Sequence, residues 1–187
     1  MSYAHALTVS RIFLSPLLPL LYLNYASWGL SLGQMALILL GLLLVCEGSD
    51  VLDGRVARKR NEVTDLGKLL DPMADTLLHL PLFLAFTQGV VQLPLWLVLI
   101  FVYREFLISA LRSFCALRGV ALAARPFGKW KTIIQASAAI AIAALLLGVD
   151  QKLVSEAFLQ QASVWLTVVA VFYSIGSAAE YLLVARR

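Results

Sequence analysis

The chain has 187 residues, of which 61% are hydrophobic and only 14% charged, and its mean hydropathy is +0.87. A soluble domain usually carries about 25% charged residues, so this composition excludes an ordinary soluble fold and predicts an integral membrane protein. The net charge of +4 suits a surface that meets anionic lipid headgroups or phosphates, and does not indicate a nucleic-acid-binding protein.

Apolar runs of about 17 to 25 residues, the length that a membrane-spanning helix requires, predict six transmembrane helices in one all-α domain covering residues 1–187. Residues 1–10 are weakly amphipathic and are expected to form a short interfacial segment. The expected spans are residues 12–28, 32–50, 68–88, a fourth beginning near residue 93, then 130–148 and 162–184. The fourth should continue as a helix through the polar residues 103–118, beyond the hydrocarbon.

The basic residues concentrate on one side of this expected topology. Two loops and the C-terminal end hold Arg55, Arg58, Lys59, Arg60, Lys68, Arg112, Arg118, Arg125, Lys129, Lys131, Arg186 and Arg187. The loops on the opposite side hold only Lys152. The positive-inside rule therefore places both termini at the cytoplasmic face of the cell membrane, in a multi-pass protein.

Four aspartates stand at helical spacing where the second and third spans meet. Asp50 and Asp53 end the second span and Asp71 and Asp75 open the third, so an antiparallel hairpin brings both pairs to the same depth. One Asp at a helix centre costs about 2.5 to 3.5 kcal/mol on insertion scales, and a divalent cation is the natural compensation. Oxygen ligands without Cys or His favour Mg²⁺ or Mn²⁺ over zinc. A solvated loop with scattered carboxylates is the alternative, but it needs no such helical phase.

Residues between the two pairs indicate what the metal would hold. Gly54 and Gly67 lack side chains where a bulky ligand could approach the backbone, and Arg58 offers a planar fork to phosphate oxygens. The set predicts a bound diphosphate.

The pattern Asp50-x2-Asp53-Gly54-x2-Ala57-Arg58-x8-Gly67-x3-Asp71-x3-Asp75 resembles the complete signature of the CDP-alcohol phosphatidyltransferase family. The resemblance implies a six-helix membrane enzyme, usually a homodimer, that moves a phosphatidyl or similar group from a CDP-linked donor to an alcohol and releases CMP. It implies two metal ions on the Asp quartet, with Asp75 also the base that takes the proton of the attacking hydroxyl. The implied donor-binding residues are Asp53, Gly54, Ala57, Arg58 and Gly67.

Motifs outside the signature, and one that includes its last two aspartates, resemble the family members that use glycerol 3-phosphate. They are Leu7-Thr8-x2-Arg11, Asp71-Pro72-x-Ala74-Asp75, Arg104-Glu105-x3-Ser109-x2-Arg112, Gly128-Lys129-x-Lys131-Thr132-x2-Gln135 and Glu180-Tyr181. These motifs favour transfer from CDP-diacylglycerol to glycerol 3-phosphate in phospholipid biosynthesis. Thr76 stands where such enzymes are expected to have Lys. Phosphatidylglycerol, inositol phosphate and serine therefore stay as alternative acceptors.

The acceptor should need its own phosphate site. Arg104, Arg112, Lys129 and Lys131 are predicted to form it, since cations near a membrane require water or anions, and Arg112 and Lys129 should matter most. The alternative is ordinary loop charge, or an ion pair with Glu105.

Several other residues are interpreted as structural. Cys46 and Cys115 lack metal-type spacing and are expected to pack as small residues, while His5 and His79 stand alone. Glu47 lies one turn before Asp50, where packing at a polar opening is favoured over tuning of the metal site.

The small residues within 136–144 predict a tight helix contact or a dimer seam. A divalent-cation transporter is the competing class of protein. It should show polar residues along a continuous path, whereas the outer halves of the expected spans are nearly all apolar.

Overall fold

The computed structural model describes the backbone of residues 11–59, 65–117 and 126–185, and the side chains of residues 11–49, 73–111, 114–115 and 130–179. All regular structure in these ranges is helical. The six helices of the described ranges are α2 (Leu17–Asn24), α3 (Leu32–Lys59), α4 (Asp65–Ala85), α5 (Leu95–Leu117), α6 (Pro126–Asp150) and α7 (Glu156–Ala185). The all-α fold class is thereby confirmed, with one helix in each expected segment.

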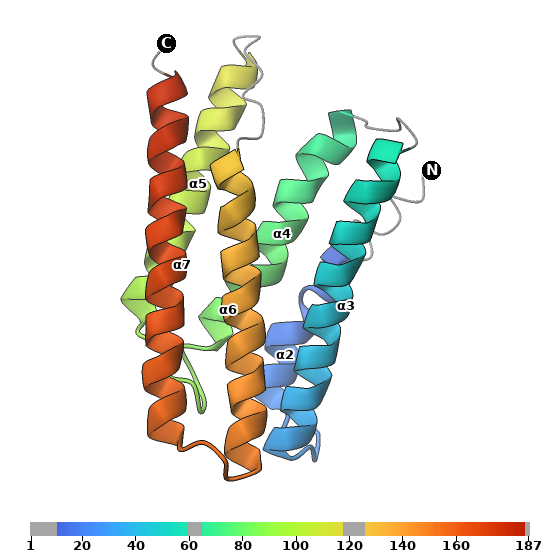
Figure 1. The fold of residues 1–187 in the computed structure, drawn as a ribbon, viewed down its shortest axis with the longest axis vertical. Helices are drawn as coiled ribbons and strands as arrows, with labels where there is room; N and C mark the ends of the chain where they lie inside the picture. The colour runs from blue at the N-terminus through green and yellow to red at the C-terminus, as the bar shows by residue number, and fades with distance from the viewer. Residues whose placement is uncertain (1–10, 60–64, 118–125, 186–187) are drawn as a thin grey trace.

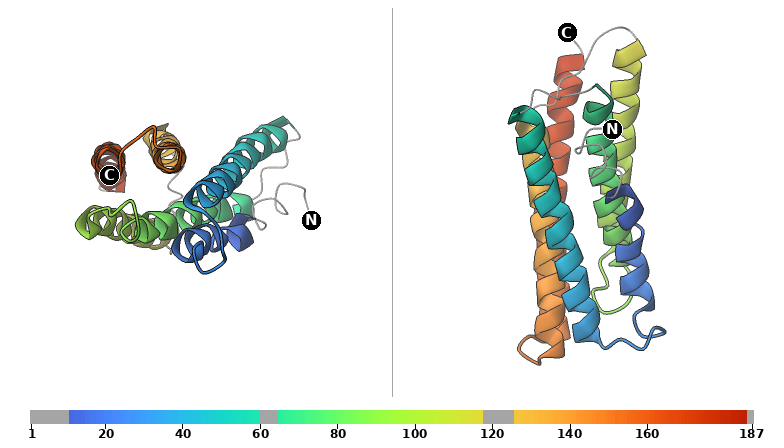
Figure 2. Two further views of the ribbon diagram at one scale, coloured as in Figure 1. Left: turned by 90° about the horizontal axis from the view of Figure 1, so that it is seen from below. Right: turned by 90° about the vertical axis from the view of Figure 1, so that its right-hand side faces the viewer.

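The helices form an elongated bundle in which chain neighbours run up and down (Figure 1). Helix α6 packs against α3 and α7, α5 packs against α7, and α2 contacts both α3 and α4. The ends of α3, α5 and α7 lie at the upper end of Figure 1, with the starts of α4 and α6. The views in Figure 2 show the same arrangement from below and from the side. These helix ends are far apart in the sequence and are close in sequence to most of its charged residues. The bundle gathers them at one end.

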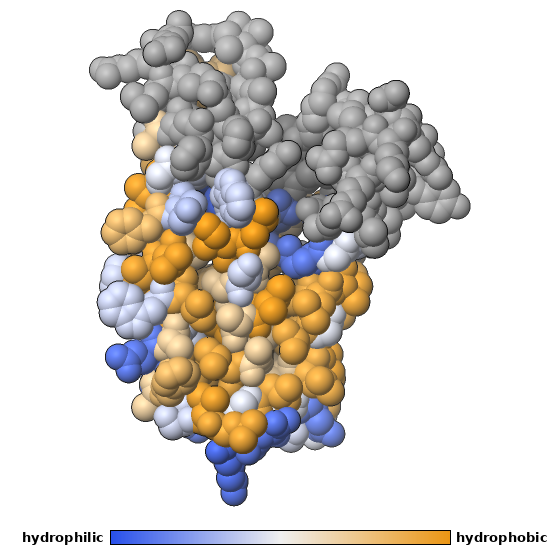
Figure 3. Space-filling view, in the orientation of Figure 1, coloured by the Kyte–Doolittle hydropathy of each residue, from blue (hydrophilic) through white to orange (hydrophobic). Residues whose placement is uncertain are grey.

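Within the described residues, three helices contain stretches long and apolar enough to cross a membrane, at Leu32–Ser49, Trp130–Asp150 and Glu156–Ala179. The part of α4 whose side chains are described contains a shorter apolar stretch, Met73–Ala85. Large apolar side chains also cover the outside of the bundle, as at Phe172 and Leu107, which are 73% and 69% exposed. Figure 3 shows apolar residues across the middle of the face in view. The fold is consistent with a membrane protein.

The N-terminal region departs from the single helix expected over residues 12–28. Residues 11–14 are helical, Ser15 and Pro16 form a turn, and α2 then spans only 8 residues. Proline has no backbone N–H, and the Ser15 hydroxyl donates to the Ile12 carbonyl at 2.9 Å, so the helical ladder is interrupted here. The second expected span agrees with the candidate span Leu32–Ser49, and α3 continues as a helix beyond it to Lys59.

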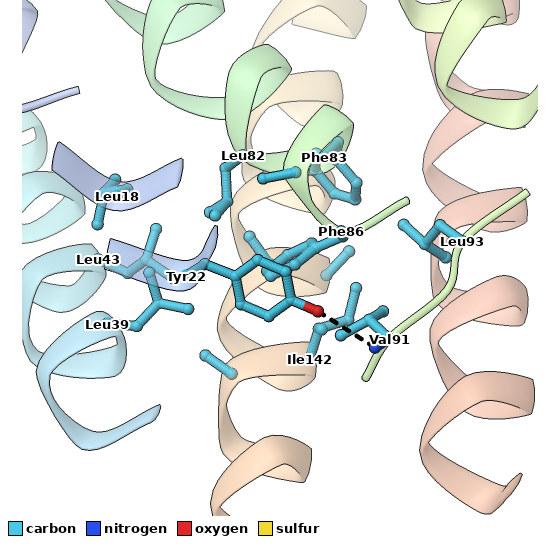
Figure 4. Packing of buried hydrophobic residues seen from close by; sticks show 14 of the residues in the cluster. Leu18, Tyr22, Leu39, Leu43, Leu82, Phe83, Phe86, Val91, Leu93 and Ile142 are labelled. Carbon is cyan, nitrogen blue, oxygen red and sulfur yellow. Dashed lines mark hydrogen bonds between the residues drawn. The ribbon is translucent and has the colours of Figure 1, made fainter. Parts of the chain in front are cut away.

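Buried hydrophobic residues of the core pack around Tyr22, as Figure 4 shows. Its hydroxyl donates to the Gln88 carbonyl at 2.9 Å and accepts from the Val91 N–H at 3.2 Å. The intervening Gly89 has φ +66, and a Cβ there would lie 3.0 Å from the Tyr22 hydroxyl oxygen. The ring of Tyr22 meets Phe86 edge to face, with centroids 5.1 Å apart. Tyr22 thus ties α2 to the turn that joins α4 and α5.

Small residues allow α6 to pack closely against its neighbours. Ala139 and Ala143 are fully buried within the single chain, and α6 lies against both α3 and α7. On the facing part of the core, α7 buries Ser163, Thr167 and Ala170. The tight helix contact predicted within residues 136–144 is therefore an internal one.

Candidate active site

Helix bounds place the signature residues at the upper end of the bundle. Asp50, Asp53, Gly54, Ala57 and Arg58 belong to the last turns of α3, whose backbone is helical as far as Lys59. Gly67 and Asp71 belong to the first turns of α4, and Asp75 follows one turn later. The spacing of the quartet predicted that each Asp pair lies on a helix. The first pair lies on α3 and the second on α4, and the end of α3 and the start of α4 lie at the same end of the bundle (Figure 1).

The side chains of Asp50, Asp53, Ala57, Arg58 and Asp71 lie outside the described residues, as do those of the predicted acceptor residues Arg112 and Lys129. Their assignment to metal, donor and acceptor stays a prediction.

Asp75 is the member of the quartet whose side chain is described. Its carboxylate is half-buried, 26% exposed, and Oδ1 lies 3.5 Å from Nη1 of Arg11. The Arg11 side chain is 3% exposed. The sequence indicates Arg11 only as part of an N-terminal motif. The structure places Arg11 beside Asp75, the carboxylate with the predicted catalytic role. The guanidinium offsets the charge of a carboxylate held partly away from water.

Glu47 and His79 meet one turn below the quartet. His79 is 3% exposed, and its Nε2 lies 3.0 Å from Oε1 of Glu47, within ion-pair distance although outside hydrogen-bond geometry. The other ring nitrogen, Nδ1, is 3.0 Å from the carbonyl oxygen of Asp75. The expectation that His79 stands alone is wrong. Its position four residues after Asp75 was the available signal, because that spacing returns to the same helix face.

A second polar cluster joins four helices around Glu105 of α5. Oε1 of Glu105 accepts from Nη1 of Arg104 at 2.8 Å and from Nζ of Lys131 on α6. The Thr76 hydroxyl of α4 donates to Oε2 at 3.4 Å. Arg104 also donates through Nε to the Ser174 carbonyl of α7 at 3.1 Å and through Nη2 to the Ser177 hydroxyl.

The two described acceptor candidates are therefore paired with a carboxylate. Arg104 and Lys131 have side chains only 7% and 10% exposed, and both contact Glu105. The ion pair with Glu105, foreseen as the alternative to an acceptor site, is present. Thr76, which replaces an expected Lys, donates to the same carboxylate, so Glu105 receives one neutral donor there instead of a third cation.

A small cavity lies between these two clusters. It is lined by Thr76, His79, Leu80, Phe83, Phe101, Glu105, Lys131 and Gln135, and holds about 10 Å³. That volume suits a single water molecule, so this cavity does not hold the substrates.

The four aspartates are of the type that binds a hard divalent cation. Carboxylate oxygens suit Mg²⁺ or Mn²⁺. Among the described side chains no three of His, Cys, Asp and Glu form a metal-binding group, and three of the four quartet side chains lie beyond them. Cys46 and Cys115 are free and buried, as expected of packing residues.

Fold and site together define an all-helical protein of membrane type, with ionisable groups at one end of an apolar bundle. A model of the CDP-alcohol phosphatidyltransferase family matches residues 1–175. The chain belongs to this family, as its signature indicates.

Individual proteins similar to this chain have names that are more specific than the family's. The CDP-diacylglycerol–glycerol-3-phosphate 3-phosphatidyltransferase of Bacillus subtilis is 36% identical over 182 residues, covering 94% of this chain and 90% of the relative. The enzyme of that name from Rickettsia typhi is 36% identical over 76% of this chain and 74% of its own. A CMP-forming cardiolipin synthase of Streptomyces coelicolor is 39% identical over 99 residues, 53% of this chain and 44% of its own.

Proposed function

We propose that this protein is a phosphatidylglycerolphosphate synthase. It transfers the phosphatidyl group of CDP-diacylglycerol to glycerol 3-phosphate, giving phosphatidylglycerol phosphate and CMP. The observation that carries this proposal is the similarity to the Bacillus subtilis enzyme named for that reaction, which extends over 90% of that protein. The outer motifs of the sequence favour the same acceptor.

The Asp quartet is the proposed site of two divalent ions, with Asp50, Asp53, Asp71 and Asp75 as ligands. Bound Mg²⁺ or Mn²⁺ would supply neutralisation of the diphosphate oxygens of the donor. The backbone near Gly54, Ala57 and Gly67 would admit the donor closely, and Arg58 would bind its phosphate. Support comes from the helix ends on which both Asp pairs lie.

Asp75 is the proposed base. Its carboxylate would take the proton of the attacking hydroxyl while the hydroxyl oxygen bonds to the phosphorus of the phosphatidyl group. The bond from that phosphorus to the CMP oxygen breaks in the same step. The described position of Asp75 supports this role, because its carboxylate is half-buried and therefore still reachable.

The acceptor phosphate would bind at the basic residues of the same end, namely Arg104, Arg112, Lys129 and Lys131. Glu105 already balances Arg104 and Lys131. A phosphate that carries about two negative charges needs further positive charge, and this favours Arg112 and Lys129 as its direct partners. Arg104 and Lys131 would then support the site through Glu105.

The proposed setting is the cytoplasmic face of the cell membrane, with six membrane-crossing segments, both termini in the cytoplasm, and a homodimer as the assembly. The one-sided distribution of Lys and Arg supports the orientation. The family resemblance supports the dimer.

Cardiolipin synthesis is the second candidate, and the similarity to the Streptomyces coelicolor protein favours it. In that case the acceptor would be phosphatidylglycerol. The similarity covers only 53% of this chain, against 94% for the Bacillus subtilis relative, so glycerol 3-phosphate is the better-supported acceptor.

The test is release of CMP by purified protein in detergent, given CDP-diacylglycerol with Mg²⁺ or Mn²⁺. Glycerol 3-phosphate should support rapid release, and serine, inositol phosphate and phosphatidylglycerol much less. Equal release with inositol phosphate overturns the acceptor assignment. Release that persists in excess chelator overturns the metal requirement.

A further inference from the structure

The contact between Glu47 and His79 joins α3 directly to α4. Each helix packs against α2 and α6, which lie beside both of them. Glu47 stands on α3 three residues before Asp50, and His79 stands on α4 four residues after Asp75. The contact therefore links the two helices that carry the two halves of the Asp quartet.

Helix geometry relates this contact to the register of α3 and α4, that is, to their relative position along the bundle axis. A helix rises about 1.5 Å per residue, so Asp50 lies about 4.5 Å beyond Glu47, and Asp75 about 6 Å beyond His79. The helices run in opposite directions, so both steps lead toward the upper end of the bundle (Figure 1). Asp50 and Asp75 therefore both lie about one helical turn from the contact between Nε2 and Oε1, on the same side of it.

The orientation of the His79 ring is fixed by its second nitrogen. Nδ1 lies 3.0 Å from the carbonyl oxygen of Asp75, which only accepts hydrogen bonds, so Nδ1 carries the hydrogen. Nε2 then faces Oε1 of Glu47 at 3.0 Å, and because both atoms otherwise only accept hydrogen bonds, their attraction requires a proton on one of them. The ring is 3% exposed and the Glu47 side chain 23%, so water does not readily replace either partner. One buried side chain thus contacts the backbone of Asp75 and reaches across to α3.

We propose that Glu47 and His79 are positioning residues that set the register between α3 and α4, and so hold the two Asp pairs at the separation that the divalent ions require. The inference rests on the proposed function, because it assumes that the quartet binds metal. Neither residue belongs to the family signature in this chain. Their role is to orient the carboxylates, not to touch the substrates.

The experiment measures Mn²⁺ binding to the purified protein in detergent by electron paramagnetic resonance, independently of activity. Glu47→Leu and His79→Leu, which cannot form a hydrogen bond, should each raise the Kd for Mn²⁺ by about 10- to 100-fold, the usual effect of losing a residue that orients metal ligands. Glu156→Leu, at an exposed carboxylate at the start of α7, is the matched control, and so is Leu77→Ala on the exposed face of α4. Both controls should keep the wild-type Kd.

The double variant separates a shared register from two independent defects. Because each single change already removes the contact, Glu47→Leu with His79→Leu should bind Mn²⁺ no more weakly than the worse single variant. In turnover, the Mn²⁺ concentration for half-maximal CMP release should rise in both single variants while the KM for glycerol 3-phosphate stays the same. General loosening of the fold would change both quantities.

Wild-type Mn²⁺ affinity in folded Glu47→Leu overturns the proposal, and so do additive effects in the double variant. If His79→Leu fails to fold, Glu47→Leu decides alone, with its thermal midpoint as the check of folding. Failure of the proposed function gives a different result. The wild-type protein would then bind Mn²⁺, with the binding changed as described, yet release no CMP from CDP-diacylglycerol with glycerol 3-phosphate.

Discussion

Asp75 is the single side chain on which the proposed chemistry depends most. Asp75→Asn keeps the size of the side chain and one carbonyl oxygen, but the amide cannot take a proton from the acceptor hydroxyl. We expect kcat to fall by about 100- to 10,000-fold, the usual contribution of a positioned base. Binding of the CDP-linked donor, measured by calorimetry, should survive. Asp150→Asn, on an exposed carboxylate at the opposite end of the bundle, is the matched control.

Retained turnover in Asp75→Asn would remove Asp75 as the base. Loss of donor binding together with turnover would instead indicate that Asp75 acts mainly as a metal ligand.

Glu105 neutralises two cations that are nearly out of contact with water. Glu105→Gln leaves Arg104 and Lys131 without that negative charge, although their side chains are only 7% and 10% exposed. Breaking a buried ion pair by removing one partner typically costs about 3 to 5 kcal/mol. We therefore expect a clearly lower thermal midpoint in detergent, and Glu156→Gln should leave the midpoint unchanged. An unchanged midpoint in Glu105→Gln would show that α4, α5, α6 and α7 do not depend on this cluster.

Among the helices, the seam between α6 and its neighbours is the contact most sensitive to volume. Ala143 is fully buried, whereas the next residue, Ala144, is exposed on the same helix. Ala143→Leu inserts extra methylene groups into a filled interface, which typically costs about 1 to 3 kcal/mol, while Ala144→Leu adds an apolar group on the outside. Thermal unfolding in detergent should separate the two variants. Equal midpoints would contradict the packing of α6 described above.

The helices were predictable where the sequence repeats a strong local pattern. The apolar runs placed α3, α6 and α7, and the spacing of the Asp pairs placed both pairs on helices. The polar stretch after Tyr103 was correctly expected to stay helical, as α5 does as far as Leu117. The turn at Ser15 and Pro16 was missed because the apolar composition continues through it, and composition does not register a missing backbone hydrogen bond.

Contacts between distant residues were the part that the sequence could not supply. Helical spacing indicates which residues share a face, but not which neighbouring helix that face meets. Glu47 and His79 are 32 positions apart, and Arg104 reaches residues about 70 positions away on α7. Such pairs follow from how α3, α4, α5 and α7 pack. The charges could be placed at one end of the fold, but their pairing could not be derived.

Across the whole molecule, charge and apolar surface divide along the long axis. The ends of α3, α5 and α7 gather at one end, and the turn between α6 and α7 is at the other (Figure 1). Most Lys and Arg are close in sequence to the ends of α3, α5 and α7 or to the starts of α4 and α6. Apolar residues cover the middle of the face shown in Figure 3. If this apolar middle lies in the bilayer, the α6–α7 turn and the end of α7 lie on opposite sides of the membrane. The positive-inside rule then places the turn outside the cell.

Cysteine labelling in cells tests this orientation directly. Leu153 lies in the α6–α7 turn and is 77% exposed, so Leu153→Cys should react with a membrane-impermeant maleimide on intact cells. Arg187→Cys should react only after the membrane is permeabilised. The native thiols Cys46 and Cys115 are buried, and replacing both with Ala provides the unlabelled background. Labelling of Arg187→Cys but not Leu153→Cys on intact cells would invert the topology, and with it the face at which a soluble glycerol phosphate reaches the aspartates.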